Sequence, residues 1–196
     1  MLNFRPILLL DMDQTIADLY PELIRRHNTC YGTNLSPRKY KQYFGDHNIL
    51  TDIISREHVD KIFASGSFFR DLLPIAGAQA AVSYLEQSFD IYIVSNPFLG
   101  ANHPYMDKYR WLQEFFPTLA NKFIATPCKH VVSGRILVDD HMPFCRKWRK
   151  YNPDGLVASL QYPWTDMSIV DIVASKWSTL AQKILTAATK AGLISR

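Results

Sequence analysis

At 196 residues and 47% hydrophobic composition, the chain is long and apolar enough to bury a core, which excludes an intrinsically disordered protein. The net charge of +4 is mild, and the densest basic stretch, residues 146–150, is interpreted as a solvated helix face, so a nucleic-acid partner is not favoured. Cys30, Cys128 and Cys145 lie far apart with no Cys-x-x-Cys pair, which argues against a disulfide framework or a zinc site and fits a reducing compartment.

Nothing in the sequence indicates export or a membrane anchor. The first predicted strand begins within a few residues of Met1, which leaves no room for a signal or transit peptide. No apolar run approaches the ~20 residues that a membrane-spanning helix needs. We therefore expect a cytoplasmic protein with no membrane partner.

The first third of the chain is predicted to hold one strand and a helical block. A short apolar run over residues 6–10 indicates a buried strand, and a helix is predicted over 15–31, with Gly32 as its end. No strand is expected between residues 16 and 74, where apolar residues recur at helical spacing. This block is predicted to be an insertion after the first strand.

Helices and strands alternate from residue 74 onward. Helices are expected over 77–87 and 105–116, and residues 168–191 are expected to close the chain mostly as helix. The strands expected here share short apolar runs: 90–95, 122–125, 135–138 and, as the last strand, 156–160. Every connection is long enough for the crossover that parallel strands require, so an α/β fold with a parallel sheet is predicted.

Polar side chains stand where three of these strands end. Asp11 and Asp13 follow the first strand, Ser95 ends the second, and Asp139-Asp140 follow a third. Because open α/β sheets bind ligands at the carboxyl ends of their strands, we expect these side chains to converge on one crevice. Carboxylates crowded together repel one another unless a cation lies among them, and hard oxygen ligands select Mg²⁺.

Each piece taken alone also has an ordinary explanation. Asp13 or Thr15 could cap a helix. Asp139 and Asp140 could be solvated turn residues, and Lys129 is one of 22 basic residues, most of which lie on the surface.

The order of these motifs along the chain is more specific for one protein family than any single motif is. A strand with Asp-x-Asp-x-Thr, a strand ending in Ser, a Lys after a strand, and a strand with Asp-Asp together resemble the haloacid-dehalogenase-like phosphohydrolases. Within that superfamily, nearly the whole chain is similar to the 5′(3′)-deoxyribonucleotidases. The similar residues outside the strand ends are Phe68-Phe69, Leu73-Pro74, Gly77-Ala78, the runs 108–111 and 129–132, and Trp177.

The resemblance implies a Rossmann-like, three-layer parallel sheet core with a small helical cap inserted after the first strand. The core would comprise residues 1–15 and 76–196, and the cap would comprise residues 16–75. The resemblance also implies a homodimer.

It implies the following roles in the core. Asp11 would attack phosphorus and form an aspartyl-phosphate, and Asp13 would protonate the leaving oxygen and then activate water. Ser95 and Asn96 would bind phosphate oxygens, and Lys129 would neutralise charge on both the phosphate and Asp11.

The implied cofactor is Mg²⁺. It would lie between the carboxylates of Asp11 and Asp140, the backbone carbonyl of Asp13 and the phosphate, with Asp139 in support.

The resemblance also suggests a pocket for the base, since nucleobases stack on aromatic faces. Its expected members are Leu19, Tyr43, Phe44, Phe63, Phe69 and Phe98. The chain departs from the family at several positions. Gln14 stands where Gly is more usual, Leu19 where an aromatic is expected, Asn96 where a small hydroxyl is usual, and Cys128 where an acid is usual.

The sequence thus predicts a Mg²⁺-dependent phosphomonoesterase acting on deoxyribonucleoside monophosphates. Two alternatives stay open. The same chemistry could act on another small ester such as a phosphosugar or phosphoglycolate, or on a nucleic-acid terminal phosphate. A different class of protein, a non-catalytic nucleotide-binding protein on the same fold, is the second alternative.

Overall fold

The computed structural model describes residues 5–36, 54–101 and 103–195. Its main sheet has six parallel strands in the order β5-β4-β1-β6-β7-β8. Their bounds are Ile7–Leu10 (β1), Asp90–Ser95 (β4), Phe123–Ala125 (β5), Ile136–Val138 (β6), Leu156–Leu160 (β7) and Ile172–Ala174 (β8). The predicted base-pocket residues Tyr43 and Phe44 lie outside the described residues.

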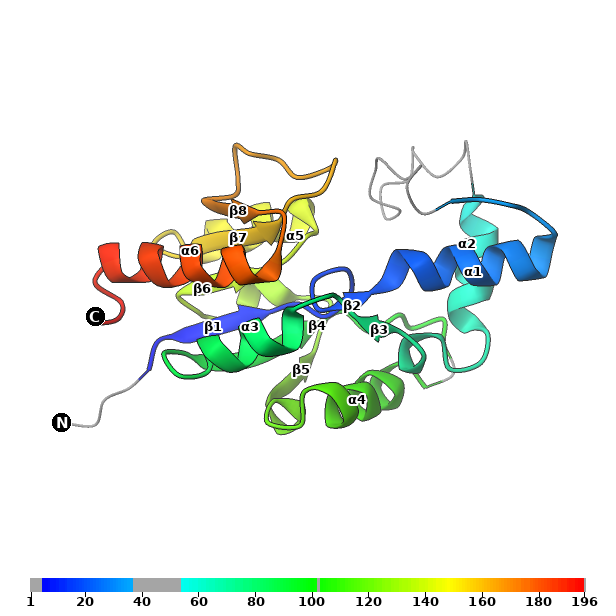
Figure 1. Ribbon diagram of the computed structural model, residues 1–196, viewed down its shortest axis with the longest axis horizontal. Coiled ribbons are helices and arrows are strands. Elements are labelled where there is room, and N and C mark those ends of the chain that lie inside the picture. The colour runs from blue at the N-terminus through cyan, green and yellow to red at the C-terminus, as the bar shows by residue number, and fades with distance from the viewer. Residues whose placement is uncertain (1–4, 37–53, 102, 196) are drawn as a thin grey trace.

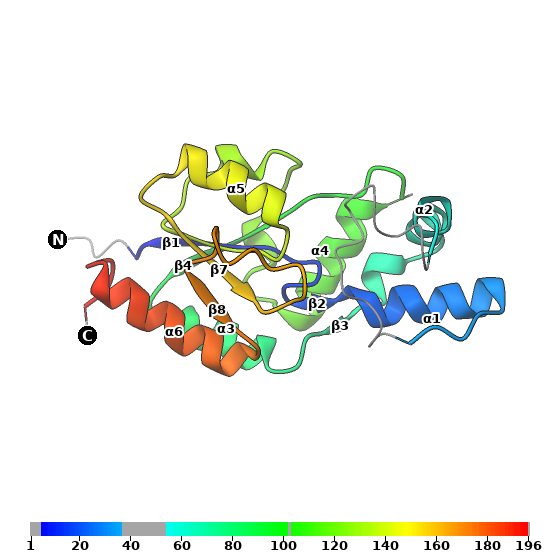
Figure 2. The ribbon, with the colours of Figure 1, turned by 90° about the horizontal axis from the view of Figure 1, so that it is seen from above.

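Helices cover both faces of this sheet (Figure 2). Helices α3 (Ala78–Leu85) and α6 (Trp177–Lys190) lie on one face, and α5 (Met142–Tyr151) lies on the other. The strands alternate accordingly: Leu8 and Leu10 of β1 belong to the core under α3 and α6, whereas Leu9 packs with Trp148 of α5. The predicted three-layer α/β fold is confirmed.

The remaining helical elements lie at the edges of the core. Helix α4 (Pro104–Phe115) contributes Trp111 and Leu112 to the core under α3 and α6. Short 3₁₀ turns are formed by η3 (Phe68–Arg70), η4 (Ala120–Lys122) and η5 (Lys129–Val131). No helix within the described ranges is long and apolar enough to cross a membrane.

The segment between β1 and α3 extends beyond the carboxyl ends of the strands (Figure 1). It contains α1 (Leu19–Tyr31), which begins four residues later than the predicted helix start, and α2 (Arg56–Ala64). The expectation of no strand here was wrong, because β2 (Ala17–Asp18) pairs antiparallel with β3 (Leu73–Pro74). Two-residue strands are too short to show a period, so only the tertiary fold reveals their pairing.

The end of the chain also differs from the prediction. The strand β7 is not the last one, because β8 adds a further parallel strand, and α6 begins only at Trp177. The three apolar residues of β8 fit a helical pattern as well as a buried strand, so periodicity alone could not separate the two. The other predicted strands and the helices α3 and α4 are found within one to three residues of their expected bounds.

Candidate active site

The predicted site residues lie at the carboxyl edge of the sheet. Asp11 follows β1, Ser95 ends β4, and Asp139 and Asp140 follow β6. Strand β1 lies between β4 and β6, so the chain leaves β1 at the point where the strand order reverses. Open α/β sheets form their ligand-binding crevice at such a switch point, because the connecting segments diverge to opposite faces there.

Lys129 joins two of the carboxylates. Its Nζ lies 2.6 Å from Asp11 Oδ1 and donates to Asp139 Oδ2 at 2.7 Å, and its side chain is only 2% exposed. Burial favours the neutral amine, but the two carboxylates outweigh it, so the pKa of Lys129 is raised above its usual value. Lys129 is therefore a permanent positive charge beside Asp11.

A second buried lysine, Lys108 of α4, contacts the other carboxylate of the loop. Its Nζ donates to Asp13 Oδ2 at 2.5 Å, to Ser95 Oγ at 2.8 Å and to the backbone oxygen of Asn96 at 3.1 Å. No motif in the sequence assigns a role to Lys108. One sequence feature could have indicated it. Lys108 lies within one turn of Trp111 on the apolar face of an amphipathic helix, and a charged side chain there needs an oppositely charged partner.

The ordinary explanations of these residues do not match the structure. Asp13 pairs with Lys108 rather than capping α1, which begins at Leu19. Asp139 is fully buried, and Asp140 is 2% exposed, so neither is a solvated turn residue.

The acidic cluster has the donor set of a Mg²⁺ site. One carboxylate oxygen from each of Asp11, Asp139 and Asp140 lies within 4.8 Å of the others. Both oxygens of Asp139 already accept hydrogen bonds, one from Lys129 and one from the backbone N–H of His141. Asp140 Oδ2 is buried and has no hydrogen-bond partner among the described residues, so it is an oxygen free to bind a cation.

The charges agree with this interpretation. The site holds four carboxylates and two ammonium groups, which in their usual charge states leave an excess of two negative charges: Asp11, Asp13, Asp139, Asp140, Lys108 and Lys129. One divalent cation would balance that excess. The residues present therefore fit Mg²⁺, which prefers oxygen ligands.

The pKa values of three acids in the site are raised above their usual range. Burial is the main cause for Asp13, Asp139 and Asp140. Lys129 opposes it at Asp139, where the pKa reaches about 7, and the Asp139 carboxylate adds to it at Asp140. Binding of a cation would favour the ionised forms of Asp139 and Asp140 and lower their pKa values.

A cavity of about 480 Å³ opens above these residues toward the predicted cap. Its apolar wall includes the four described members of the predicted base pocket: Leu19, Phe63, Phe69 and Phe98. The Phe63 ring lies 5.3 Å from Phe98 and 5.4 Å from Phe69, centroid to centroid. Arg56, at the start of α2, also lines the cavity, although no sequence motif predicts it as a site residue.

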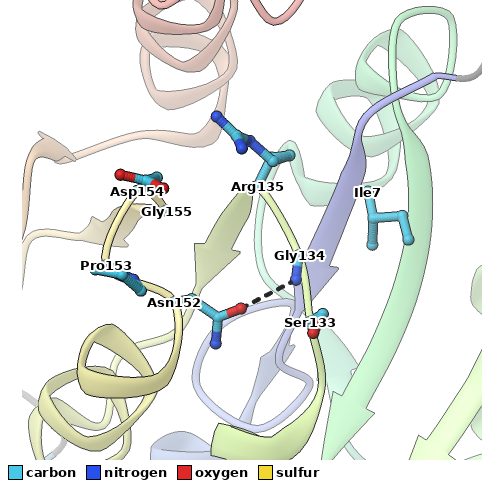
Figure 3. A pocket seen from close by; sticks show the side chains of 8 residues that line it. All are labelled: Ile7, Ser133, Gly134, Arg135, Asn152, Pro153, Asp154 and Gly155. Atoms are coloured by element: carbon cyan, nitrogen blue, oxygen red, sulfur yellow. Dashed lines mark hydrogen bonds between the residues drawn. The ribbon is translucent and has the colours of Figure 1, made fainter.

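A second cavity, of about 330 Å³, lies at the amino ends of the strands, opposite the end that carries Asp11 (Figure 3). It is lined at the amino ends of β1, β6 and β7 by residues such as Ile7, Arg135 and Gly155. Arg135 and Asp154 are its charged members, and it has neither a paired nucleophile and base nor a carboxylate cluster among its lining residues. The cavity above Asp11 is therefore the candidate active site.

Comparison with known proteins adds independent information. A family model described as 5′ nucleotidase, deoxy (pyrimidine), cytosolic type C protein matches residues 5–189. The human 5′(3′)-deoxyribonucleotidase of cytosolic type is 30% identical over 143 residues, which cover 67% of this chain and 69% of that protein. The 5′(3′)-deoxyribonucleotidase of Bacillus subtilis is 26% identical over 145 residues, covering 69% of this chain and 76% of that protein.

Solved structures agree on the fold. A magnesium-bound HAD-hydrolase from Bacillus subtilis superposes with a TM-score of 0.59 at 16% identity, covering 92% of this chain and 98% of that chain. At this identity the likeness shows a shared haloacid-dehalogenase-like fold.

Proposed function

Since the chain belongs to the 5′ nucleotidase, deoxy (pyrimidine), cytosolic type C family, we propose that it hydrolyses deoxyribonucleoside monophosphates to deoxynucleoside and phosphate. Membership makes it a phosphoric monoester hydrolase of the haloacid-dehalogenase-like superfamily. The observation that carries the proposal is the pair of buried lysines, each bonded to one carboxylate of the Asp11–Asp13 loop at the floor of an aromatic-walled cavity.

The first step proposed is attack by Asp11. Its carboxylate forms a bond to phosphorus while the ester P–O bond breaks, which gives an aspartyl-phosphate. The Lys129 ammonium at 2.6 Å offsets negative charge that would otherwise repel the incoming phosphate. It also keeps Asp11 fixed within the loop.

Asp13 supplies the protons. Burial raises the pKa of Asp13, although Lys108 opposes this effect, so the acid holds its proton to a higher pH than usual. We infer that it donates this proton to the leaving oxygen and then accepts one from the water that hydrolyses the aspartyl-phosphate. Hydrolysis returns Asp11 as a carboxylate and releases phosphate.

The phosphate oxygens are proposed to bind where polar hydrogens converge. Ser95 and Asn96 line the floor of the cavity with Lys129. Lys108 bonds to Ser95 Oγ and to the Asn96 backbone oxygen, so it sets the positions of both residues as well as that of Asp13.

We propose Mg²⁺ as the cation, held by the carboxylates of Asp11 and Asp140 and the backbone carbonyl of Asp13, with Asp139 in support. When bound, it would supply charge neutralisation and polarise the phosphoryl group. Asp139 would hold its neighbours in place, since both of its oxygens already accept hydrogen bonds.

The cap is proposed to comprise residues 16–75, between two core segments, 1–15 and 76–196. The pairing of β2 with β3, where the segment leaves and re-enters the core, supports these boundaries. Leu19, Phe63 and Phe69 come from this segment, so the cap would provide part of the apolar wall for the base, and the core would provide the rest, including Phe98. A cytosolic location, as in the human relative, and a homodimer complete the proposal.

The test is phosphate release from deoxyribo- and ribonucleoside monophosphates and small phosphosugars, with Mg²⁺ or with EDTA. We expect Mg²⁺-dependent release that is fastest with the deoxyribonucleotides. Release of phosphate from phosphosugars alone would support phosphomonoester hydrolysis but reject deoxyribonucleotides as the substrates. Nucleotide binding without any release would favour the non-catalytic alternative.

A further inference from the structure

Gln14 is the only described residue other than glycine that has a positive φ, at +54°. Side chains disfavour this left-handed conformation because Cβ approaches the backbone, whereas glycine adopts it freely. Gln14 directly follows Asp13, and its side chain is almost wholly buried. A strained, buried glutamine beside the loop that carries Asp11 and Asp13, here called the catalytic loop, requires compensating contacts.

One set of contacts reaches the first helix of the proposed cap. Gln14 Oε1 accepts hydrogen bonds from the backbone N–H groups of Leu19 at 3.2 Å and Tyr20 at 3.3 Å. These amides open α1, so they have no acceptor within the helix. Asp18, the residue at the N-cap position, makes no side-chain capping bond, so Gln14 takes its place from outside the helix.

The other set of contacts reaches the loop that follows β7. Gln14 Nε2 donates to the Tyr162 hydroxyl at 3.2 Å, and this hydroxyl donates to the backbone oxygen of Gln14 at 2.9 Å. The Tyr162 ring stacks on Trp164 at 4.6 Å, and Trp164 lies 5.4 Å from Tyr20 of α1. Gln14 thus connects three segments: the catalytic loop, the start of α1 and the β7 loop.

Leu19 links the contacts of Gln14 to the proposed substrate pocket. Its amide is held by Gln14, and its side chain lines the cavity above Asp11. We propose that Gln14, together with Tyr162, is a positioning residue that fixes the Leu19 wall of the cavity relative to the catalytic loop and so sets the fit of the deoxynucleoside. This inference rests on the proposed function.

The kinetic test uses Gln14→Gly, which keeps the backbone conformation and removes the side chain, and Tyr162→Phe, which removes only the hydroxyl. We expect each variant to raise KM for a deoxyribonucleoside monophosphate about threefold to tenfold, as for one or two lost hydrogen bonds, with kcat changed less than about twofold. Phenyl phosphate, which cannot fill the nucleoside part of the cavity, should be hydrolysed as by the wild type.

The double variant and a matched control sharpen this test. If the two residues act through one connection, the KM rise in Gln14→Gly/Tyr162→Phe should be smaller than the product of the single effects. Tyr84→Phe removes the hydroxyl of an exposed tyrosine on α3 and should leave KM unchanged. Equal losses of kcat on both substrates, or multiplicative single effects, would overturn the proposal.

A measurement without substrate separates this inference from the proposed function. Hydrogen exchange of the Leu19 and Tyr20 amides should be slow in the wild type and much faster in Gln14→Gly, because these two amides lose their acceptor. Unchanged exchange would overturn the inference even in an active enzyme. Faster exchange in a protein that releases no phosphate from deoxyribonucleotides would retain the connection and reject the proposed function.

Discussion

Two buried lysines hold the two aspartates at the floor of the cavity: Lys129 pairs with Asp11, and Lys108, which lies beneath the lining residues, pairs with Asp13. The two lysines therefore position different groups. Lys129 fixes Asp11, whereas Lys108 fixes Asp13 together with Ser95. Both ammonium groups are buried, so their charge acts in a medium that screens it weakly.

Replacement of Lys108 tests this division. We expect Lys108→Met, which keeps the length of the side chain, to lower kcat about 10²- to 10³-fold because Asp13 and Ser95 lose their common donor. Steady-state kinetics would measure the loss, and circular dichroism would confirm folding. Lys122→Met removes a lysine that pairs with Asp90 away from the cavity and should retain activity. Wild-type kcat in Lys108→Met would refute this role.

Arg56 is the charged side chain that the described part of the proposed cap brings to the cavity. Its guanidinium can donate to carbonyl oxygens of a base or to ester oxygens. We expect Arg56→Ala to raise KM for deoxyribonucleotides several-fold with little change in kcat. Arg135→Ala, in the second cavity at the amino ends of the strands, is the matched control. A similar KM rise in both variants would argue against a role for Arg56.

Local motifs explain which of these residues sequence reasoning could find. Asp11, Ser95 and Asp139 stand directly at strand ends, so a local pattern places them on one edge of the sheet. Lys108 and Arg56 lie on helices, and only the packing of α4 and α2 brings Lys108 to Asp13 and Arg56 to the cavity. No spacing rule within the sequence encodes that direction.

At the scale of elements, α1 and α2 are joined by a buried histidine. His27 Nε2 lies 3.1 Å from His58 Nδ1, and His27 Nδ1 lies 2.9 Å from Thr33 Oγ1. Burial is the main reason that the pKa of His27 is lowered from its usual 6.5, and His58 adds to the effect. Protonation would place an unfavourable charge between the two helices.

The sign of the pH dependence follows from this shift. Because the folded-state pKa lies below the unfolded value of 6.5, the unfolded chain binds more protons as the pH falls below about 7, and stability is lost there. We expect the free energy of unfolding to fall less steeply between pH 7 and 5 in His27→Gln than in the wild type. Urea titrations at each pH would measure it. His103→Gln, at an exposed histidine, should keep the wild-type slope.

Elements also show where prediction from sequence ends. Strand β1 and helix α3 were predictable because each combines a clear apolar pattern with a turn residue directly before it, Pro6 and Gly77 respectively. Strands β2 and β3 were not, since they consist of two residues each and owe their conformation to each other. Strand β8 was missed because its three residues also fit the helical pattern of the segment that follows.

At the scale of the whole molecule, the cation should contribute to stability as well as to catalysis. The carboxylates of Asp11, Asp139 and Asp140 lie close together and are buried, so a cation that binds them stabilises the folded state. A ligand at 100 times its Kd adds about 2.7 kcal/mol to the free energy of unfolding. We therefore expect Mg²⁺ to raise Tm by several degrees in thermal unfolding, and EDTA to reverse the effect.

Asp140→Asn tests whether the rise in Tm comes from Mg²⁺ bound at the acidic cluster. Burial and the neighbouring acids raise the pKa of Asp140 well above its usual value, so the neutral amide should be tolerated in EDTA. In Mg²⁺ this variant should gain little or no Tm. Asp154→Asn, in the second cavity at the amino ends of the strands, should respond as the wild type does. A full Mg²⁺ response in Asp140→Asn would place the cation elsewhere.

The central claim is that Asp11 carries the phosphoryl group, and trapping tests it most directly. Wild-type enzyme and Asp11→Asn would be mixed with a deoxyribonucleoside monophosphate and Mg²⁺, quenched in acid during turnover and digested for mass spectrometry. We expect a phosphoryl adduct on the peptide containing Asp11 in the wild type. Asp11→Asn should show no adduct and a loss of turnover on the order of 10⁴-fold or more. An adduct on another residue, or near-normal turnover by Asp11→Asn, would contradict the account.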